Sequence, residues 1–349
     1  MSPFKPGSLP AFLYSQFLVT PSLDPAVSFT GQTVIVTGSN VGLGFSAAQQ
    51  IAQRGASRVI LAVRTVSKGE TAAQQIRSSL PPSNSTAQIE AWPLDLSSYQ
   101  SVKDFAARAN KLDRLDLLLE NAGVAKMSFE LEEGDESTIT TNVIATTLLA
   151  VLLLPKLRET AKKFGVVPHL TIVSSEVSFH TTFEERKAEN IFERLADPKA
   201  GMSGRYEVSK LLQNFVVREL AERVSSDGGP FVIVNTVNPG FCQSSLRRNV
   251  SGLGLTVFFF IMETIVQRKT AVGARTLVHG ASAGKESHGQ LLSDCAVHAS
   301  PLDKGRWREA AEAEGKSGDD LDERKLRKRI WSELMIKLEK VEPGVSKLI

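Results

Sequence analysis

Short runs of β-branched and aliphatic residues alternate along this chain with segments typical of helices. Strands separated by helices in this way pair in parallel, because each crossover helix returns the chain to the same end of the sheet. The pattern predicts an α/β fold: a single doubly wound domain at about residues 30–300, with a mainly parallel sheet of about seven strands flanked by helices. The predicted strands lie at residues 33–37, 58–63, 87–94, 115–119, 170–174, 231–237 and 290–293, and the predicted helices at 46–54, 67–79, 138–160 and 206–223.

Three segments lie outside this alternation. Residues 1–29 lack the continuous apolar run of a signal peptide and are expected to form a leader, either flexible or packed on the fold. The polar insert at 178–205 is too long for a plain connection, which favours a lid or binding loop; whether it faces a substrate stays open. The charged extension at 301–349 predicts a terminal helix docked by one face, with nuclear targeting as the weaker alternative. Its apolar residues at helical spacing are Leu326, Ile330, Leu334 and Leu338.

Charge and composition exclude several classes of protein. With 41 Lys and Arg against 38 Asp and Glu, the net charge of +3 argues against binding to nucleic acid. The two cysteines, Cys242 and Cys295, and the five scattered histidines predict neither a disulfide framework nor a metal site. The apolar run at 253–266 is too short to cross a bilayer, so no transmembrane segment and a cytoplasmic location are expected.

A glycine-rich turn joins the first predicted strand to the first predicted helix, between Thr37 and Gly44. Glycines at this point let backbone N–H groups and the helix N-terminus approach a pyrophosphate without interference from Cβ atoms. The spacing differs from the Gly-x-Gly-x-x-Gly fingerprint, so the strand–turn–helix context carries the argument. The turn predicts a Rossmann-type dinucleotide site that includes Gly38, Asn40, Gly42, Leu43 and Gly44.

The second predicted strand ends at Arg64, with Lys68 following and no carboxylate at this point. An NAD-binding protein carries an acidic residue here for the ribose 2′-hydroxyl, whereas a guanidinium suits a 2′-phosphate. The sequence therefore predicts NADP(H) as the cofactor. The alternative is that Arg64 is a surface residue on a loop.

Tyr206 and Lys210 open a predicted helix four residues apart, which places them on one face. An ammonium beside a phenol lowers the phenol pKa from about 10, so the pair can exchange a proton with an alcohol or a carbonyl. Tyr-x-x-x-Lys occurs often by chance. Here it follows a predicted strand that ends in Ser174 and Ser175, whose hydroxyls can reach a substrate oxygen.

Together these motifs resemble the short-chain dehydrogenase/reductase family over about residues 30–300. The retinol-dehydrogenase-like branch is the most similar, because it also has Arg after the second strand and a longer segment before Tyr, and fungal biosynthetic reductases share this pattern. The motifs that carry the resemblance are residues 37–44, Asp95-Leu96, Asn121-Ala122-Gly123, Asn142, Ser174-Ser175, Tyr206 with Lys210, and Asn238-Pro239-Gly240.

The resemblance implies a role for each matching residue. Tyr206 would be the acid/base and Ser175 would orient the carbonyl. Lys210 would hold the nicotinamide ribose and lower the Tyr206 pKa, while Asn142 would anchor a water in the proton relay. The remaining implied cofactor contacts are Asp95 and Leu96 at the adenine, Asn121, Ala122 and Gly123 along the cleft, and Pro239, Gly240 and Ser244 or Ser245 near the nicotinamide. The resemblance also implies a substrate lid at 241–268.

Two positions depart from the family pattern. Ser175 and Tyr206 are 206 − 175 = 31 positions apart, more than in minimal members, so Ser174 and Ser178 remain alternatives to Ser175. Glu120 stands at the end of an apolar strand, where a buried carboxylate needs a partner or a raised pKa, unless it turns to solvent.

These inferences predict an NADP(H)-dependent oxidoreductase that interconverts a carbonyl and an alcohol on a small, lipophilic or secondary-metabolite substrate. The alternatives are a non-catalytic NADP-sensing or scaffold protein on the same fold and, less favoured, a methyltransferase. The resemblance further implies a homodimer paired through the helices that bear Asn142 and Tyr206, unless the C-terminal extension blocks that surface.

Overall fold

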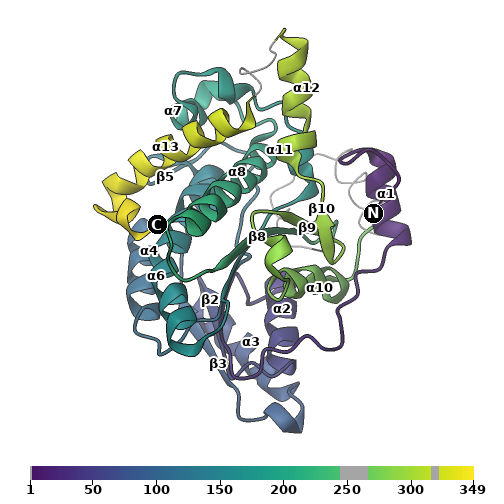
Figure 1. Ribbon diagram of the computed structural model, residues 1–349, viewed down its shortest axis with the longest axis vertical. Coiled ribbons are helices and arrows are strands. Elements are labelled where there is room, and N and C mark those ends of the chain that lie inside the picture. The colour runs from purple at the N-terminus through teal and green to yellow at the C-terminus, as the bar shows by residue number, and fades with distance from the viewer. Residues whose placement is uncertain (1, 244–265, 316–321) are drawn as a thin grey trace.

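The computed structural model describes residues 2–243, 266–315 and 322–349. An eight-stranded sheet crosses the centre of the molecule in the order β10-β9-β8-β7-β4-β1-β2-β3 (Figure 1). All neighbouring strands are parallel except β9 and β10. The strands are β1 (Thr33–Thr37), β2 (Arg58–Val63), β3 (Gln88–Pro93), β4 (Leu117–Glu120), β7 (His169–Val173), β8 (Ile233–Asn238), β9 (Leu291–Ser293) and β10 (Ala296–His298).

The predicted doubly wound fold is confirmed, and all seven predicted strands are present with ends shifted by up to two residues. The eighth strand, β10, was not predicted. It follows β9 through a two-residue turn in which Asp294 and Cys295 both have positive φ, of 54° and 60°. Asn-Gly or Asp-Gly would signal such a turn in a sequence, and this one lacks glycine.

Helices cover both faces of the sheet (Figure 1). Each layer has its own apolar core, because the strands carry aliphatic side chains on both faces. On one face lie α2 (Gly42–Gln53), α3 (Val66–Ser78) and α10 (Thr270–Gly280), and on the other α4 (Tyr99–Ala109), α6 (Thr146–Phe164) and α8 (Arg205–Ser226). A short helix, α5 (Ser137–Ile139), and a π-helical stretch, Thr140–Ala145, lead into α6.

The continuous helical stretch Ser137–Phe164 is long and apolar enough to span a membrane by length and composition. However, 94% of its apolar window is buried inside the protein. Its side chains pack against the sheet and α8, so this stretch is a core helix.

The leader forms helix α1 (Leu9–Leu18), which lies against the end of the molecule that carries β10 (Figure 1). Gln16 fixes it there. The Gln16 amide donates to the carbonyls of Phe241 and Val266, both at 3.0 Å, and accepts from the Phe241 N–H at 3.1 Å. Arg268 adds a second connection, since it bonds the Ser15 and Val19 carbonyls.

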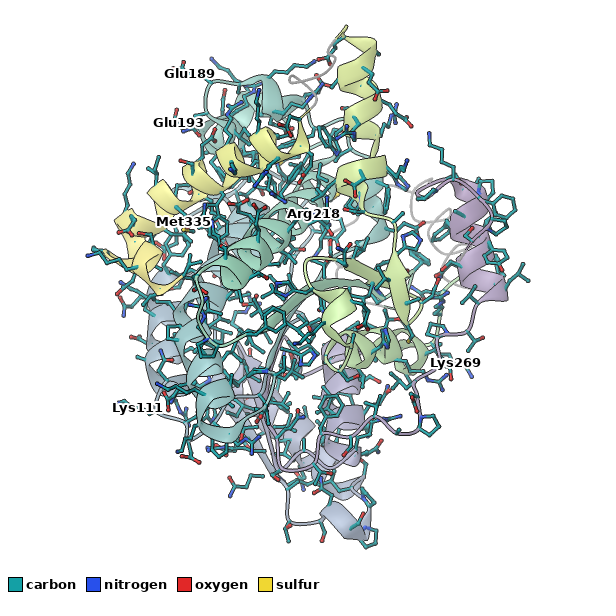
Figure 2. The ribbon with its side chains drawn as sticks, in the orientation of Figure 1. Lys111, Glu189, Glu193, Arg218, Lys269 and Met335 are labelled. Carbon is teal, nitrogen blue, oxygen red and sulfur yellow. The ribbon has the colours of Figure 1, made fainter. Side chains whose placement is uncertain are left out.

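The insert at 178–205 is folded against the body of the protein. Phe183 and Phe192 are fully buried in the same core as α6 and α8, while Glu189 and Glu193 point outward (Figure 2). The insert contains a short helix, α7 (Ile191–Ala196). Its backbone carbonyls at residues 186, 188 and 189 all accept hydrogen bonds from Arg329 of the C-terminal extension.

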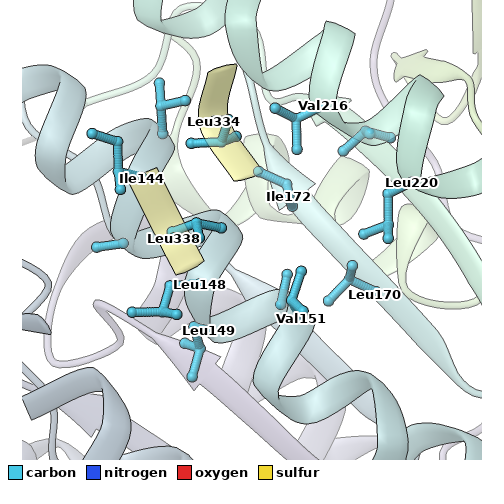
Figure 3. Close-up of a cluster of buried hydrophobic side chains, with 14 of the residues drawn as sticks. Ile144, Leu148, Leu149, Val151, Leu170, Ile172, Val216, Leu220, Leu334 and Leu338 are labelled. Atoms are coloured by element: carbon cyan, nitrogen blue, oxygen red, sulfur yellow. The ribbon is translucent and has the colours of Figure 1, made fainter. Parts of the chain in front are cut away.

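The C-terminal extension contains α11 (Pro301–Lys304), α12 (Arg306–Ala313) and α13 (Glu323–Val341). Helix α13 crosses the outer side of α8 (Figure 1). Leu334 and Leu338 lie in the apolar cluster with Ile144, Leu148 and Val216 (Figure 3). The helix thus covers part of a surface through which the resemblance implied pairing of two subunits.

We expect Leu334→Ala to lower the free energy of unfolding by about 2–5 kcal/mol, because Leu334 is fully buried and its loss leaves a cavity. Ile336 is the matched control on the same helix. Its side chain is 57% exposed, so Ile336→Ala should change stability by less than about 0.5 kcal/mol. Urea denaturation of the two variants measures both effects. Equal, small losses would show that α13 does not pack stably on α8.

Candidate active site

A cleft of about 510 Å³ opens at the carboxyl ends of β1, β2 and β4. Strand order reverses at this point of the sheet, which is where open α/β folds bind their ligands. The predicted cofactor residues that line it are Gly38, Asn40, Gly42, Leu43, Arg64, Lys68, Asp95, Leu96, Asn121, Ala122 and Gly123.

Other lining residues were missed by sequence reasoning. Val41, Thr65 and Ser97 lie directly beside predicted positions and could have been included. Lys126 and Glu132 had no sequence signal. Lys126 lies in the segment that follows β4, and Glu132 belongs to a short hairpin, β5 (Leu131–Glu132) and β6 (Asp135–Glu136). The rest of the lining is Ala62, Leu94, Val124, Ala125 and Thr141.

The glycine-rich turn is bonded directly to the end of β4. The Thr37 hydroxyl accepts the N–H groups of Asn121 at 3.0 Å and Ala122 at 2.9 Å, while the Asn121 amide donates to the carbonyls of Thr37 and Gly38. A Cβ on Gly44 would stand 2.4 Å from the Asn121 Nδ2 atom. Gly44 therefore does not line the cleft, but its lack of a side chain lets the two strand ends meet.

The start of α2 fits a pyrophosphate. No side chain caps this helix among the described residues, so its first N–H groups are left for another acceptor. Gly42, at its first position, has a φ of +65°, and a Cβ there would enter open space rather than protein. A helix N-terminus of this kind favours a negatively charged ligand.

Charged side chains gather at the other end of the cleft. Arg64 and Lys68 are exposed there, and Lys126 pairs with Glu130 at 2.8 Å. Burial raises the pKa of Glu132, and the charges of Lys126 and Arg64 oppose this rise. The Asp95 carboxylate already accepts from the Ser97 N–H at 3.0 Å and hydroxyl at 2.7 Å.

The lining of the cleft includes none of the four predicted catalytic residues, but three of them, Asn142, Tyr206 and Lys210, lie close together beyond its Gly123 end. The Lys210 ammonium lies 5.6 Å from the centre of the Tyr206 ring. Gly123 connects this pair to the cleft, because a Cβ there would be 3.1 Å from Asn142 Oδ1 and 3.8 Å from Lys210 Nζ. Burial lowers the pKa of Lys210 to about 7.

Asn142 lies in the π-helical stretch before α6. Its amide exchanges hydrogen bonds with the backbone of Val124, N–H to Oδ1 and Nδ2 to carbonyl, both at 2.8 Å. It also donates to the Ser209 hydroxyl at 3.0 Å. The side chain thus fixes the segment after Gly123 against the start of α8.

Three serines follow β7, and their hydrogen bonds differ. The Ser174 hydroxyl donates to the Lys210 carbonyl at 3.0 Å, and the Ser178 hydroxyl donates to the Ser175 carbonyl at 2.6 Å. Both side chains are buried. The half-buried Ser175 hydroxyl accepts from the Val177 N–H at 3.4 Å, and within the described residues it donates a hydrogen bond to no other group. The geometry therefore favours Ser175 for contact with a substrate.

The loop after β8 holds the other side of the site. Asn238 Oδ1 accepts the N–H groups of both Gly240 and Glu176, so the Pro239-Gly240 turn and the segment after Ser175 are tied together. Burial, with Asp294 nearby, raises the pKa of Glu176 to about 7. Ser244, Ser245 and residues 244–265 of the expected lid lie outside the described residues.

Glu120 is buried, with 2% of its surface exposed, and neither carboxyl oxygen has a hydrogen-bond partner among the described residues. It is paired with Ile172 across the sheet, so its side chain faces the core beneath α6. Burial raises its pKa well above the ordinary value of 4.5. The sequence left three possibilities for Glu120: a partner, a raised pKa or exposure to solvent. The structure supports the raised pKa, because the carboxyl group is buried and has no partner among the described residues.

We expect Glu120→Gln to stabilise the protein increasingly as pH rises. Folded wild type keeps the Glu120 proton where the unfolded chain has lost it, so wild-type stability falls above the unfolded pKa of about 4.5. The difference in unfolding free energy, variant minus wild type, should therefore grow by up to about 1.4 kcal/mol per pH unit. Urea denaturation between about pH 5 and pH 8 measures it.

Glu130→Gln is the control for this experiment. Lys126 lowers the pKa of Glu130, so the corresponding difference should stay constant over the same range. A flat profile for Glu120→Gln as well would mean that the buried carboxyl is already ionised in the folded protein.

Comparison with known proteins agrees with this architecture. A family model described as short chain dehydrogenase matches residues 32–182. The short chain dehydrogenase/reductase dmxR8 of Cryptosporiopsis sp. is 40% identical over 342 residues, which cover 96% of this chain and 98% of dmxR8. The short chain dehydrogenase sol3 of Alternaria solani is 41% identical over 292 residues, covering 82% of this chain and 98% of sol3.

The chain therefore belongs to the short-chain dehydrogenase/reductase family, whose members are oxidoreductases that bind a nicotinamide cofactor. Among solved structures, the Pseudomonas aeruginosa RhlG/NADP active-site complex has a TM-score of 0.57 at 21% identity, and covers 78% of this chain and 97% of that one. At this identity the likeness shows the shared fold.

Proposed function

We propose that this protein is an NADP(H)-dependent oxidoreductase that interconverts a carbonyl and an alcohol. One observation carries the proposal. Lys210 is buried beside the Tyr206 ring, and Gly123, which lines a cleft suited to a dinucleotide, lies next to both Lys210 and Asn142. Neither a scaffold protein that only senses NADP nor a methyltransferase needs a buried lysine beside a phenol.

The cleft fits the cofactor at each of its charged parts. The uncapped start of α2 would hold the pyrophosphate, and Arg64 and Lys68 would hold the 2′-phosphate of NADP(H). Asn121 and Gly123 would line the path to the nicotinamide. When bound, the cofactor supplies or accepts the hydride.

Arg64→Ala should weaken NADPH binding about ten- to a hundredfold and leave NADH binding nearly unchanged, because only NADPH carries the phosphate that the guanidinium would bond. Fluorescence titration with each cofactor measures this. Thermal stabilisation provides a second reading, since NADPH at 100 times its Kd adds about 2.7 kcal/mol. Lys111→Ala, which removes an exposed charge outside the cleft (Figure 2), is the control. Equal losses for NADPH and NADH would assign Arg64 a different role.

In reduction, the Tyr206 phenol would give its proton to the carbonyl oxygen as hydride arrives at carbon. The Ser175 hydroxyl would donate to the same oxygen, which stabilises the negative charge that develops there. In its charged form, Lys210 would lower the pKa of the Tyr206 phenol toward the range needed for proton transfer. Oxidation of an alcohol reverses these steps.

The substrate class is proposed from the resemblance to fungal biosynthetic reductases: a small lipophilic or secondary-metabolite ketone, aldehyde or alcohol. Fold and catalytic residues determine the reaction type, whereas the segments around the cleft determine the substrate. The cytoplasmic location stays a prediction.

Tyr206→Phe should bind NADPH nearly as wild type does but lower kcat by a hundredfold or more, the usual contribution of a positioned acid or base. A panel of lipophilic ketones, followed by NADPH absorbance, supplies the assay. Tyr14→Phe removes a hydroxyl from the leader helix and should retain full turnover. Comparable turnover in Tyr206→Phe would reject the mechanism, and NADPH binding without turnover of any carbonyl by wild type would favour the scaffold alternative.

A further inference from the structure

The Lys210 ammonium has an unusual environment for a catalytic cation. It is buried, and its pKa is lowered by burial alone, with no carboxylate beside it among the described residues. Two neutral oxygens accept two of its three N–H groups: the Val173 carbonyl at 2.8 Å and Gln213 Oε1 at 3.1 Å. No third oxygen in the described part of the chain accepts from the ammonium, which leaves one N–H for a ligand. Loss of either acceptor would lower the Lys210 pKa further and favour the uncharged amine.

Gln213 lies one helical turn after Lys210, with 3% of its surface exposed. Its Nε2 atom donates to the Asn142 main-chain carbonyl at 2.7 Å. The orientation of the amide is determined by its partners, because an ammonium can only donate and a carbonyl can only accept. Gln213 therefore bridges Lys210 to Asn142, the residue at which the resemblance implied a relay water.

We propose that Gln213 is a positioning residue that keeps the Lys210 ammonium charged and directed at the Tyr206 ring. The amide takes the bridging position between Lys210 and Asn142, so that Lys210 acts as a fixed cation rather than as a link to a water chain. The expected change in turnover rests on the proposed function, whereas the expected change in ionisation of the Tyr206 phenol does not. Of the other charged groups on the neighbouring segments, Arg205 lies 3.9 Å from Glu136 and 3.8 Å from Glu185, and Arg268 pairs with Asp294 at 2.6 Å. Burial and the charge of Asp294 raise the pKa of Glu176, which favours its neutral form.

The test measures ionisation of the Tyr206 phenol by near-ultraviolet difference absorbance in the full-length protein. The chain has three tyrosines, and burial raises the pKa of Tyr99 far above the titration range. Subtraction of a Tyr206→Phe titration isolates Tyr206. In Gln213→Met, which has a similar volume but no amide, the phenol should ionise about one pH unit higher or more, because the neighbouring charge is lost.

A matched variant separates positioning from general destabilisation. Asn214 is a buried amide at the next position of α8, where it donates to the Ser174 hydroxyl and the Lys210 main-chain carbonyl but does not contact the ammonium. Asn214→Leu should lower stability and leave the Tyr206 titration in place. If Gln213→Met does not fold, Gln213→Asn takes its place, since its amide is one methylene too short to reach both partners.

Kinetics provide the second reading. For alcohol oxidation, which needs the phenolate, kcat of Gln213→Met near neutral pH should fall about tenfold for each pH unit by which phenol ionisation moves upward, and should recover toward wild type at high pH. An unchanged Tyr206 titration in a folded Gln213 variant would overturn the proposal. A Tyr206 titration moved to higher pH in a protein that turns over no substrate would refute the proposed function and leave the role of Gln213 standing.

Discussion

The site depends on the contact between the ends of β1 and β4. Four hydrogen bonds between Thr37, Gly38, Asn121 and Ala122 join the two strand ends, and Gly44 has no room for even one methyl group beside them. This contact places the glycine-rich turn and the Asn121–Gly123 segment side by side in the lining of one cleft. From β1 the chain continues to β2 on one side of the sheet, and from β4 it continues to β7 on the other, so the cleft opens where the strand order reverses.

Burial of ionisable groups is the second constraint. Lys210 and Glu120 are both buried without an oppositely charged partner among the described residues, and the consequences differ. Glu120 can become neutral by keeping its proton. In the proposed mechanism Lys210 acts on Tyr206 as a cation, and the groups that accept hydrogen bonds from its ammonium are neutral oxygens of β7 and α8. Arg205, also buried, lies within 4 Å of two carboxylates.

The segments outside the central sheet are attached to the body of the protein by side-chain hydrogen bonds to loop backbone. Gln16 of the leader bonds the main-chain carbonyls of Phe241 and Val266, which lie near the two ends of the segment 241–268 that is expected to form a lid. On the opposite side, Arg329 of α13 bonds three carbonyls of the insert, and Glu333 accepts the Ile191 N–H at 2.7 Å. Both additions use side chains to satisfy loop backbone that no strand or helix can pair.

The sequence alone determined the parallel strands and the dinucleotide cleft, because periodicity, the glycine turn and the Tyr206–Lys210 spacing are local signals. Eleven predicted cofactor residues line the cleft for this reason. Tertiary structure alone decided which of the serines at 174, 175 and 178 has a hydroxyl with no acceptor among the described residues, that Glu120 is buried, and that Lys126 and Glu132 enter the cleft. It also placed Gln213 between Lys210 and Asn142, which are 210 − 142 = 68 positions apart in the sequence. Such contacts depend on how helices and loops from distant parts of the chain pack, and no spacing within one segment encodes them.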